Sequence, residues 1–119
     1  MTFDELRDYC LSKPATTESL PFDQTTLVFK VTNKMFALTS LEVKPLRISL
    51  KCEPERAVEL REAHEAIQPA FHLNKKHWNM VTSDGSLRDS LLRELIDHSY
   101  DRVVAGLPGV VRKNLISSP

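Results

Sequence analysis

The sequence predicts an α+β fold in which an antiparallel sheet is packed on helices that cover one of its faces. Three observations lead to this prediction. The chain of 119 residues is long enough for one core, and 41% of its residues are hydrophobic. Strand-like and helix-like patterns are segregated, in the order helix, three strands, helix, strand, helix (α-β-β-β-α-β-α). Residues 46–52 alternate between apolar and polar side chains without exception, which is typical of a half-buried strand.

The first predicted helix covers residues 2–11. Thr2 and Glu5 have the spacing of a capping box at its start, and its apolar residues recur at helical spacing. Pro14 would end the helix, because the residue before a proline disfavours helical geometry. Residues 13–25, rich in Pro, Thr and Ser, are expected to form a loop.

Three strands are predicted next. Residues 26–31 are β-branched and aromatic. A turn at Asn33-Lys34 would connect them to a second strand at residues 35–41, which makes a hairpin. The alternating residues 46–52 form the third strand.

A helix and a fourth strand follow the third strand. The helix begins at Pro54, a residue favoured in a first helical turn, and ends before Pro69. Residues 70–75 are expected to form a loop, and residues 77–82 read as a strand.

The last predicted helix is capped by Ser86, with Asp89 as the acidic partner of a capping box. Gly106 and Pro108 are the expected signals of its C-terminal end. We therefore expect one domain over residues 1–108 and a loosely ordered C-terminal tail over residues 109–119.

Composition also argues against several kinds of protein and site. No stretch approaches the about 18 apolar residues of a membrane helix, and residues 1–20 hold no signal-like apolar run. A cytoplasmic protein without a membrane partner is therefore expected. Cys10 and Cys52 are expected to be buried, reduced thiols. Because no metal-ligand spacing or cofactor motif is present, neither a metal nor a cofactor is expected.

The net charge of zero is the sum of segments with opposite charge. The helical segments are acidic, whereas residues 24–52 carry five basic residues and one acidic residue, and residues 71–83 carry two lysines and no acid. This segregation has two interpretations: exposed lysines discourage strand aggregation, or they form a cationic face that meets phosphates. Since alternate strand residues share a face, three cations are expected on the outer face of the sheet, namely Lys30, Arg47 and Lys51.

Residues 71–79, Phe-His-Leu-Asn-Lys-Lys-His-Trp-Asn, resemble the bacterial MmcQ/YjbR family of small proteins described as DNA-binding. The resemblance extends over nearly the whole chain and includes Leu-Pro-Phe-Asp at residues 20–23 and Leu-Ile-Asp-His-Ser-Tyr at residues 95–100. It implies a frataxin-like (CyaY-like) α+β fold, which agrees with the order of elements above. It also implies that DNA is the partner.

Transferred position by position, the resemblance implies eight nucleic-acid contacts. Lys51 and Lys75 would hold phosphates as point charges, Asn74 and His77 would hydrogen-bond a phosphate or a base edge, and Trp78 would either stack on a base or pack in the core. Because these residues lie on strands and loops, the contacts would be to the backbone and of low sequence specificity. The full set is Lys30, Lys34, Lys51, Asn74, Lys75, Lys76, His77 and Trp78.

Other functions compete with DNA binding. A protein-interaction module or a small-anion-binding module could use the same basic surface. A catalytic pair could be assembled from Cys52 with His72 or His77, but no catalytic motif surrounds these residues, so we do not expect an enzyme. Three acidic residues of the first helix suit iron chemically, but they are more simply explained as a solvated face. We therefore predict a monomeric, non-enzymatic protein that binds DNA.

Overall fold

The computed structural model describes residues 1–117. These residues form four helices: α1 (Phe3–Leu11), α2 (Pro54–Ala63), α3 (Asp89–Ala105) and α4 (Gly109–Ser117). They also form six strands: β1 (Thr16–Ser19), β2 (Thr26–Val31), β3 (Lys34–Ser40), β4 (Leu46–Lys51), β5 (Ile67–Pro69) and β6 (Trp78–Ser83).

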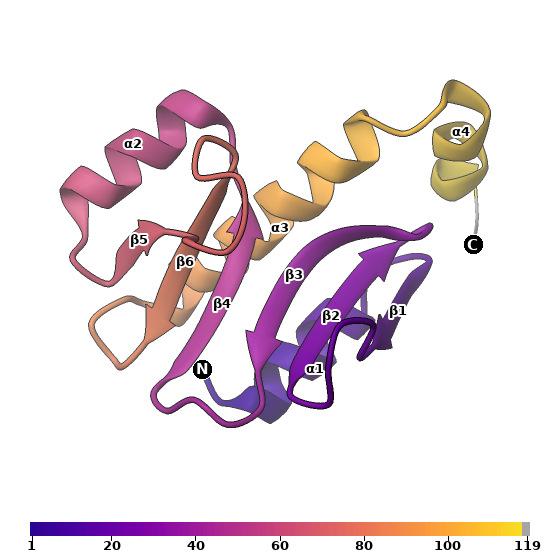
Figure 1. Cartoon of the computed structure of the whole chain (residues 1–119). Coiled ribbons are helices and arrows are strands. Elements are labelled where there is room, and N and C mark those ends of the chain that lie inside the picture. The colour runs from indigo at the N-terminus through magenta and orange to yellow at the C-terminus, as the bar shows by residue number, and fades with distance from the viewer. Residues whose placement is uncertain (118–119) are drawn as a thin grey trace.

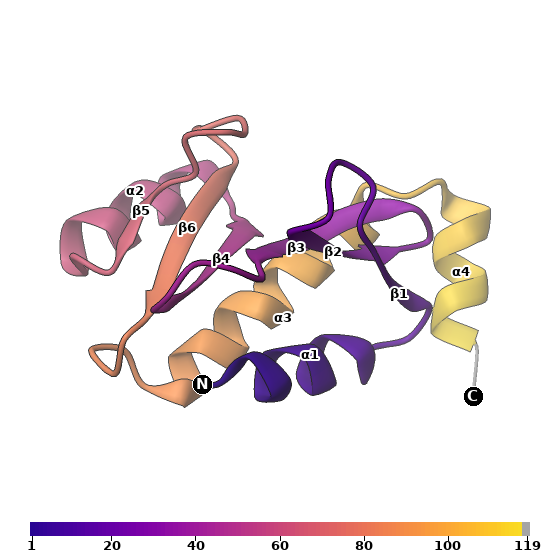
Figure 2. The ribbon, with the colours of Figure 1, turned by 60° about the horizontal axis from the view of Figure 1, so that its bottom comes forward.

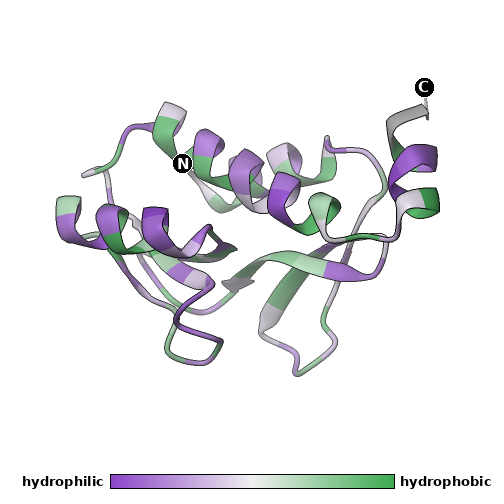
Figure 3. Ribbon diagram, turned by 90° about the horizontal axis from the view of Figure 1, so that it is seen from above, coloured by the Kyte–Doolittle hydropathy of each residue, from purple (hydrophilic) through white to green (hydrophobic). Residues whose placement is uncertain are grey.

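The strands make one sheet in the order β1-β2-β3-β4-β6-β5, and every neighbouring pair is antiparallel. Helices α1 and α3 cross one face of this sheet, and α2 packs beside them against β5 and β6 (Figures 1 and 2). Seen along the sheet, the helices line one side and two loops project from the other (Figure 3). The predicted α+β architecture is confirmed.

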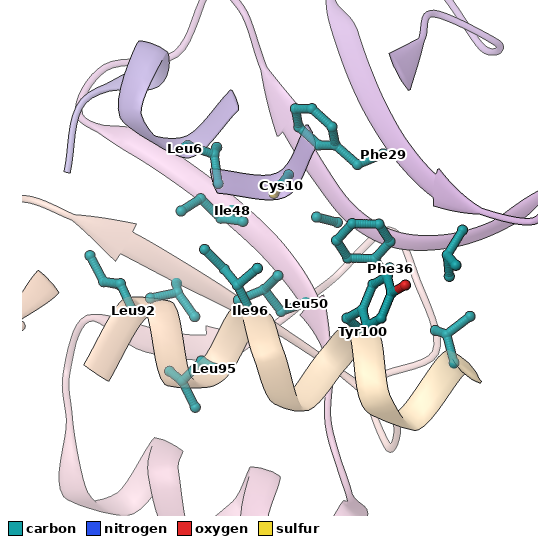
Figure 4. Close-up of a cluster of buried hydrophobic side chains, with 14 of the residues drawn as sticks. Leu6, Cys10, Phe29, Phe36, Ile48, Leu50, Leu92, Leu95, Ile96 and Tyr100 are labelled. Carbon is teal, nitrogen blue, oxygen red and sulfur yellow. The ribbon is translucent and has the colours of Figure 1, made fainter. Parts of the chain in front are cut away.

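The main core lies between the sheet and the helices. Its largest fully buried side chains include Phe29, Phe36, Leu6 and Ile96 (Figure 4). At roughly 25 cal/mol per Å² of apolar surface, burial of such side chains is the main favourable contribution to folding. The core therefore fixes the sheet from one side and leaves the opposite face available for other contacts.

Local signals placed most element boundaries correctly. The capping box of Thr2 and Glu5 is present in both directions, α2 starts at Pro54, and Gly106 caps the end of α3. The four expected strands are present to within one residue at each end. These are the places where the physical cause is local in sequence.

Two strands were missed, and both are short edge strands. The segment expected to be a loop at residues 13–25 contains β1. The helix expected to end just before Pro69 ends earlier, at Ala63, and Ile67–Pro69 forms β5. β1 consists of Thr16, Thr17, Glu18 and Ser19, so it has no apolar alternation to reveal it. β5 has three residues, too few for a periodic pattern. Both strands form because a neighbour offers a free edge, which is non-local information.

One prediction near the C-terminus was wrong. Ser86 does not cap α3: its hydroxyl donates to Asp84 at 2.6 Å, and the helix starts after Arg88 without a side-chain cap. The segment predicted as a tail, residues 109–119, contains α4, and the Leu115 side chain is buried in the main core; residues 118 and 119 lie outside the described residues. An Asp-x-Ser turn competes with a capping box for the same serine.

Candidate nucleic-acid interface

The face of the sheet opposite α1 and α3, called the outer face below, is cationic along its strands. Strand register defines which residues it contains, since directly paired residues share a face. Lys30 pairs with Met35, Lys51 with Trp78, and Arg47 with Thr82. All of these alternate with residues of the main core. The other outer-face residues of the strands are uncharged: Thr17, Ser19, Thr26, Val28, Leu38, Ser40, Ser49, Gln68 and Met80.

A small apolar cluster lies at the centre of the outer face. Val28, Leu38, Ala70 and Trp78 are buried there and form a second core, against which three partly buried side chains pack. Trp78 is only 9% exposed. Of the two roles expected for Trp78, packing is the one that the structure supports, and stacking on a base is excluded by its burial.

The segment of residues 70–77, called the basic loop below, is held in place by its own hydrogen bonds. The Asn74 side-chain oxygen accepts from the Lys76 amide at 2.9 Å, and the Asn74 carbonyl accepts from the amides of His77 and Trp78. The Ala70 amide donates to the Trp78 carbonyl at 3.1 Å. Asn74 therefore uses its side-chain oxygen to build the loop, not to contact a ligand in this conformation.

Two further contacts attach the basic loop to the framework. The Arg61 guanidinium donates to the Lys75 carbonyl at 3.3 Å and to the Asn79 side-chain oxygen at 2.8 Å. The His77 carbonyl accepts from the Cys52 amide at 2.8 Å. The His77 Nδ1 atom is buried and has no hydrogen-bond partner within residues 1–117. The predicted contact through His77 is thus less accessible than its position in the sequence suggested.

The exposed side chains of the basic loop are cationic and aromatic. Lys75 and Lys76 are both exposed, and Phe71 is 58% exposed. The Lys75 ammonium lies over the Phe71 ring, 5.2 Å from its centroid. Phe71 was not predicted as a contact. The available signal was an aromatic residue inside a predicted loop, where no strand or helix periodicity gives it a place in the core.

A second aromatic loop projects from the same face. Residues 20–25, between β1 and β2, project from the outer side of the sheet, as the basic loop does (Figure 2). Phe22 is 63% exposed. Asp23 shapes this loop by accepting from the amides of Thr25 at 2.9 Å and Thr26 at 2.7 Å. Those backbone hydrogen bonds lower the pKa of the Asp23 carboxyl, because they favour its charged form.

Lys34 does not join the other predicted contacts. It is exposed at the tip of the β2–β3 hairpin, next to Thr32 and Asn33, which adopt positive φ. Lys34 pairs with Val31, a residue of the main core, so its register position belongs to the face of the sheet opposite Lys30. The structure therefore brings Lys30 and Lys51 to the face that bears Lys75 and Lys76, and leaves Lys34 outside it.

The cysteines have the environment of inert thiols. Cys10 and Cys52 are free and buried, as predicted. Burial raises the pKa of the Cys10 thiol to about 12 and also raises the pKa of Cys52. A nucleophilic cysteine needs the opposite shift. Within residues 1–117, no helix has the length and hydropathy to cross a membrane, and no cluster of three metal-ligating side chains occurs.

The Asp-His-Ser-Tyr block makes framework contacts. Asp97 accepts from the Tyr9 hydroxyl at 2.6 Å and from the Lys13 ammonium. The Tyr100 hydroxyl donates to the Pro14 carbonyl at 2.7 Å. These bonds fasten the end of α1 and the following turn to α3. The block that carries part of the family resemblance is therefore structural rather than part of the candidate interface.

His98 supports the start of α2 in its neutral form. Its Nε2 atom accepts from the Glu53 amide at 3.1 Å, and Glu53 is the N-cap of α2. Desolvation lowers the pKa of His98, and the positive charges of Arg56 and Arg102 lower it further, against the smaller opposing effects of Asp101 and Glu53. An imidazole that must accept a hydrogen bond at Nε2 resists protonation.

Stability should therefore fall as the pH drops below about 6.5, the ordinary pKa of histidine. The unfolded chain binds the proton at a higher pH than the folded protein does, so acid favours unfolding. We expect the free energy of unfolding to decrease between pH 7.5 and pH 5.5, and His98→Gln to flatten this slope. Urea unfolding at several pH values within this range measures the free energy of unfolding. The exposed His72→Gln is the matched control and should keep the wild-type slope; an unchanged slope in His98→Gln would contradict the assignment.

Comparisons with known proteins place this architecture in a family. The YjbR family model matches residues 11–102. The uncharacterized protein YjbR of Escherichia coli K12 is 42% identical over 117 residues, which cover 98% of each chain. The uncharacterized protein YbdF of Escherichia coli O157:H7 is 39% identical over 88 residues, 73% of this chain and 71% of that one.

Two solved structures share this fold. The crystal structure of Deinococcus radiodurans protein DR2400, a DUF419 domain, has a TM-score of 0.91 at 48% identity, over 96% of this chain and 87% of that one. A Pseudomonas syringae protein has a TM-score of 0.74 at 28% identity, over 86% and 98% of the two chains. From the sequence match and the shared fold together, the chain belongs to the YjbR family.

Proposed function

We propose that this protein is a non-enzymatic DNA-binding protein that contacts phosphates through its outer face and basic loop. The observation that carries the proposal is the absence of carboxylates from the outer-face positions of the described strands, where Lys30, Arg47 and Lys51 are the only charged residues. The adjacent basic loop adds Lys75 and Lys76 and also has no acid.

The charge distribution favours weak, local binding. The chain as a whole is neutral, so it generates little long-range attraction for a polyanion. Cations concentrated on one face still release counterions when they meet phosphates, which is the main source of non-specific affinity for DNA. The expected affinity is therefore modest and strongly dependent on salt.

The framework favours contacts to the DNA backbone over reading of base sequence. The cationic residues lie on strands and a loop, and none of the three helices on the other face reaches the outer face (Figure 3). Phosphate contacts position a protein without conveying sequence. Because hydrogen bonds fix the backbone of the basic loop, binding would mainly restrict the lysine side chains, which lowers its entropic cost.

Fluorescence polarisation of a labelled duplex at low salt tests the proposal. We expect binding, with affinity falling by a slope of about −0.9 in log–log form per phosphate neutralised. The double variant Lys75→Ala with Lys76→Ala should weaken binding about tenfold and reduce the magnitude of the slope by about two.

The matched control removes the same charge from the opposite side of the molecule. Arg88→Ala with Arg93→Ala changes two exposed arginines at the start of α3, and it should leave both the affinity and the slope unchanged. Absence of binding at low salt, or equal effects of the two double variants, contradicts the proposal. Binding of small anions or acidic peptides without duplex binding would instead support the interaction-module alternative.

A further inference from the structure

We infer that the outer face binds single-stranded nucleic acid, with a base stacked on Phe71 and an adjacent phosphate at Lys75. This inference rests on the proposed function and refines its ligand. It depends on the two aromatic loops, which phosphate contacts alone do not explain.

Phe71 has the exposure and surroundings of a stacking residue. Its side chain is 58% exposed although the same loop packs Leu73 against the apolar cluster that contains the buried Trp78. The outer face therefore buries one aromatic side chain, Trp78, and leaves another, Phe71, exposed. The Lys75 ammonium lies 5.2 Å from the Phe71 ring centroid. A cation at that position is attracted to the electron-rich ring face, and a base that stacked on the ring would lie close to it.

The basic loop presents this pair rigidly. Its backbone is held by the Asn74 turn, by the Ala70–Trp78 hydrogen bond and by the Arg61 contact to the Lys75 carbonyl. A rigid aromatic residue loses little conformational freedom when a base stacks on it, because the ring has only two side-chain torsions. The architecture therefore favours stacking without loop rearrangement.

The second loop provides a matching feature across the outer face. Phe22 is 63% exposed, and Asp23 fixes its loop through two backbone hydrogen bonds. Both loops project from the same side of the sheet (Figures 2 and 3). The cationic outer face thus carries two exposed aromatic rings, on separate and internally braced loops.

This combination fits a single strand better than a duplex. In a duplex the faces of the bases are stacked on one another, so Phe71 could contact the face of a base only after that base had separated from its neighbour. A single strand exposes base faces, and proteins bind it by pairing a positive surface with aromatic platforms. The two projecting loops would also hold a duplex away from Lys30 and Lys51 on the sheet, whereas a single strand can lie between them.

Binding measurements on the full chain test the inference. The probes are oligo(dT) and oligo(U) of about twelve nucleotides, within the site size of known single-strand binders, a duplex of the same length, and heparin as a polyanion without bases. We expect tighter binding of the single strands than of the duplex. Phe71→Leu removes the ring but keeps an apolar side chain, and it should weaken single-strand binding about 5- to 100-fold while leaving heparin binding unchanged.

Val58→Ala is the control for changing an exposed apolar residue, since Val58 is 44% exposed on α2. Tighter binding of oligo(U) than of oligo(dT) supports the inference and assigns the strand as RNA. Equal binding of duplex and single strands with no effect of Phe71→Leu overturns it. In that case the proposed function still stands if the Lys75/Lys76 variant weakens binding. Failure of every nucleic-acid probe overturns both.

Discussion

Replacing Phe36 by alanine will lower the free energy of unfolding by about 3–5 kcal/mol. The Phe36 side chain has no exposed surface. Its ring meets Tyr100 edge-on, with centroids 5.3 Å apart and planes at 88° (Figure 4). The variant loses the apolar contacts of the ring and the aromatic pair, and it leaves a cavity between the sheet and α3 that the rigid surroundings cannot fill.

The backbone at Phe36 makes this position especially intolerant. The register shifts there: Lys30 pairs with Met35, and Phe29 pairs with Ala37, so Phe36 is an extra residue on its strand. Phe36 and Ala37 therefore both face the main core, and the bulge aims the ring at α3. A smaller side chain removes the reason for the bulge as well as the contacts.

Urea unfolding followed by circular dichroism measures the effect as a shift of midpoint at constant slope. The matched control is Phe22→Ala, the same chemical change at a side chain that is 63% exposed. It should alter the free energy of unfolding by less than about 0.5 kcal/mol. If the two variants unfold at similar urea concentrations, the arrangement of the core around Phe36 is incorrect.

The elements of the fold that could be predicted are those that depend only on residues close together in the sequence. Alternation at residues 46–52 and the capping box at Thr2 depend on neighbours in sequence, and both are confirmed. β1 could not be predicted, because four polar residues become a strand only when the edge of β2 is available. The bulge at Phe36 depends on how β3 meets α3, and no pattern within β3 reveals it.

The candidate site shows the same division. Alternation alone assigns Lys30, Arg47 and Lys51 to one face, and the register agrees. Trp78 could not be assigned, because an aromatic residue beside lysines has the same sequence pattern whether it is exposed or covered. The hydrogen bonds of the basic loop hold it in a conformation in which Trp78 is buried and Phe71 is exposed.

The blocks that carry the family resemblance therefore have different physical roles. In Asn-Lys-Lys-His-Trp-Asn, the asparagines and the tryptophan build the loop and its support, and Lys75 and Lys76 are exposed. In Asp-His-Ser-Tyr, each side chain bonds to the framework. A test of function should therefore change the two lysines or Phe71, because changes in the second block act first on stability.

Ser99→Ala is the second substitution for which a large effect is expected, about 2–6 kcal/mol in the free energy of unfolding. Ser99 is fully buried. Its hydroxyl oxygen accepts from the Lys51 amide at 2.8 Å and its hydroxyl donates to the Phe36 carbonyl at 2.5 Å. The β3–β4 pairing ends at Ala37 and Leu50, and beyond that pair the strands diverge (Figure 1). The Ser99 hydroxyl bridges two backbone groups that the divergence separates.

Alanine at this position leaves both backbone groups buried without a partner, at a cost of about 1–3 kcal/mol each. The exposed Ser90→Ala on the same helix is the control and should be neutral or slightly stabilising, since alanine favours helices. Hydrogen exchange gives a direct readout, because the Lys51 amide loses its acceptor and should exchange faster in Ser99→Ala, more than the global loss of stability requires. An unchanged rate at Lys51 would mean that the Ser99 hydroxyl does not bridge the two strands. Because Lys51 lies on the outer face, the same bond connects α3 to the position of a proposed phosphate contact.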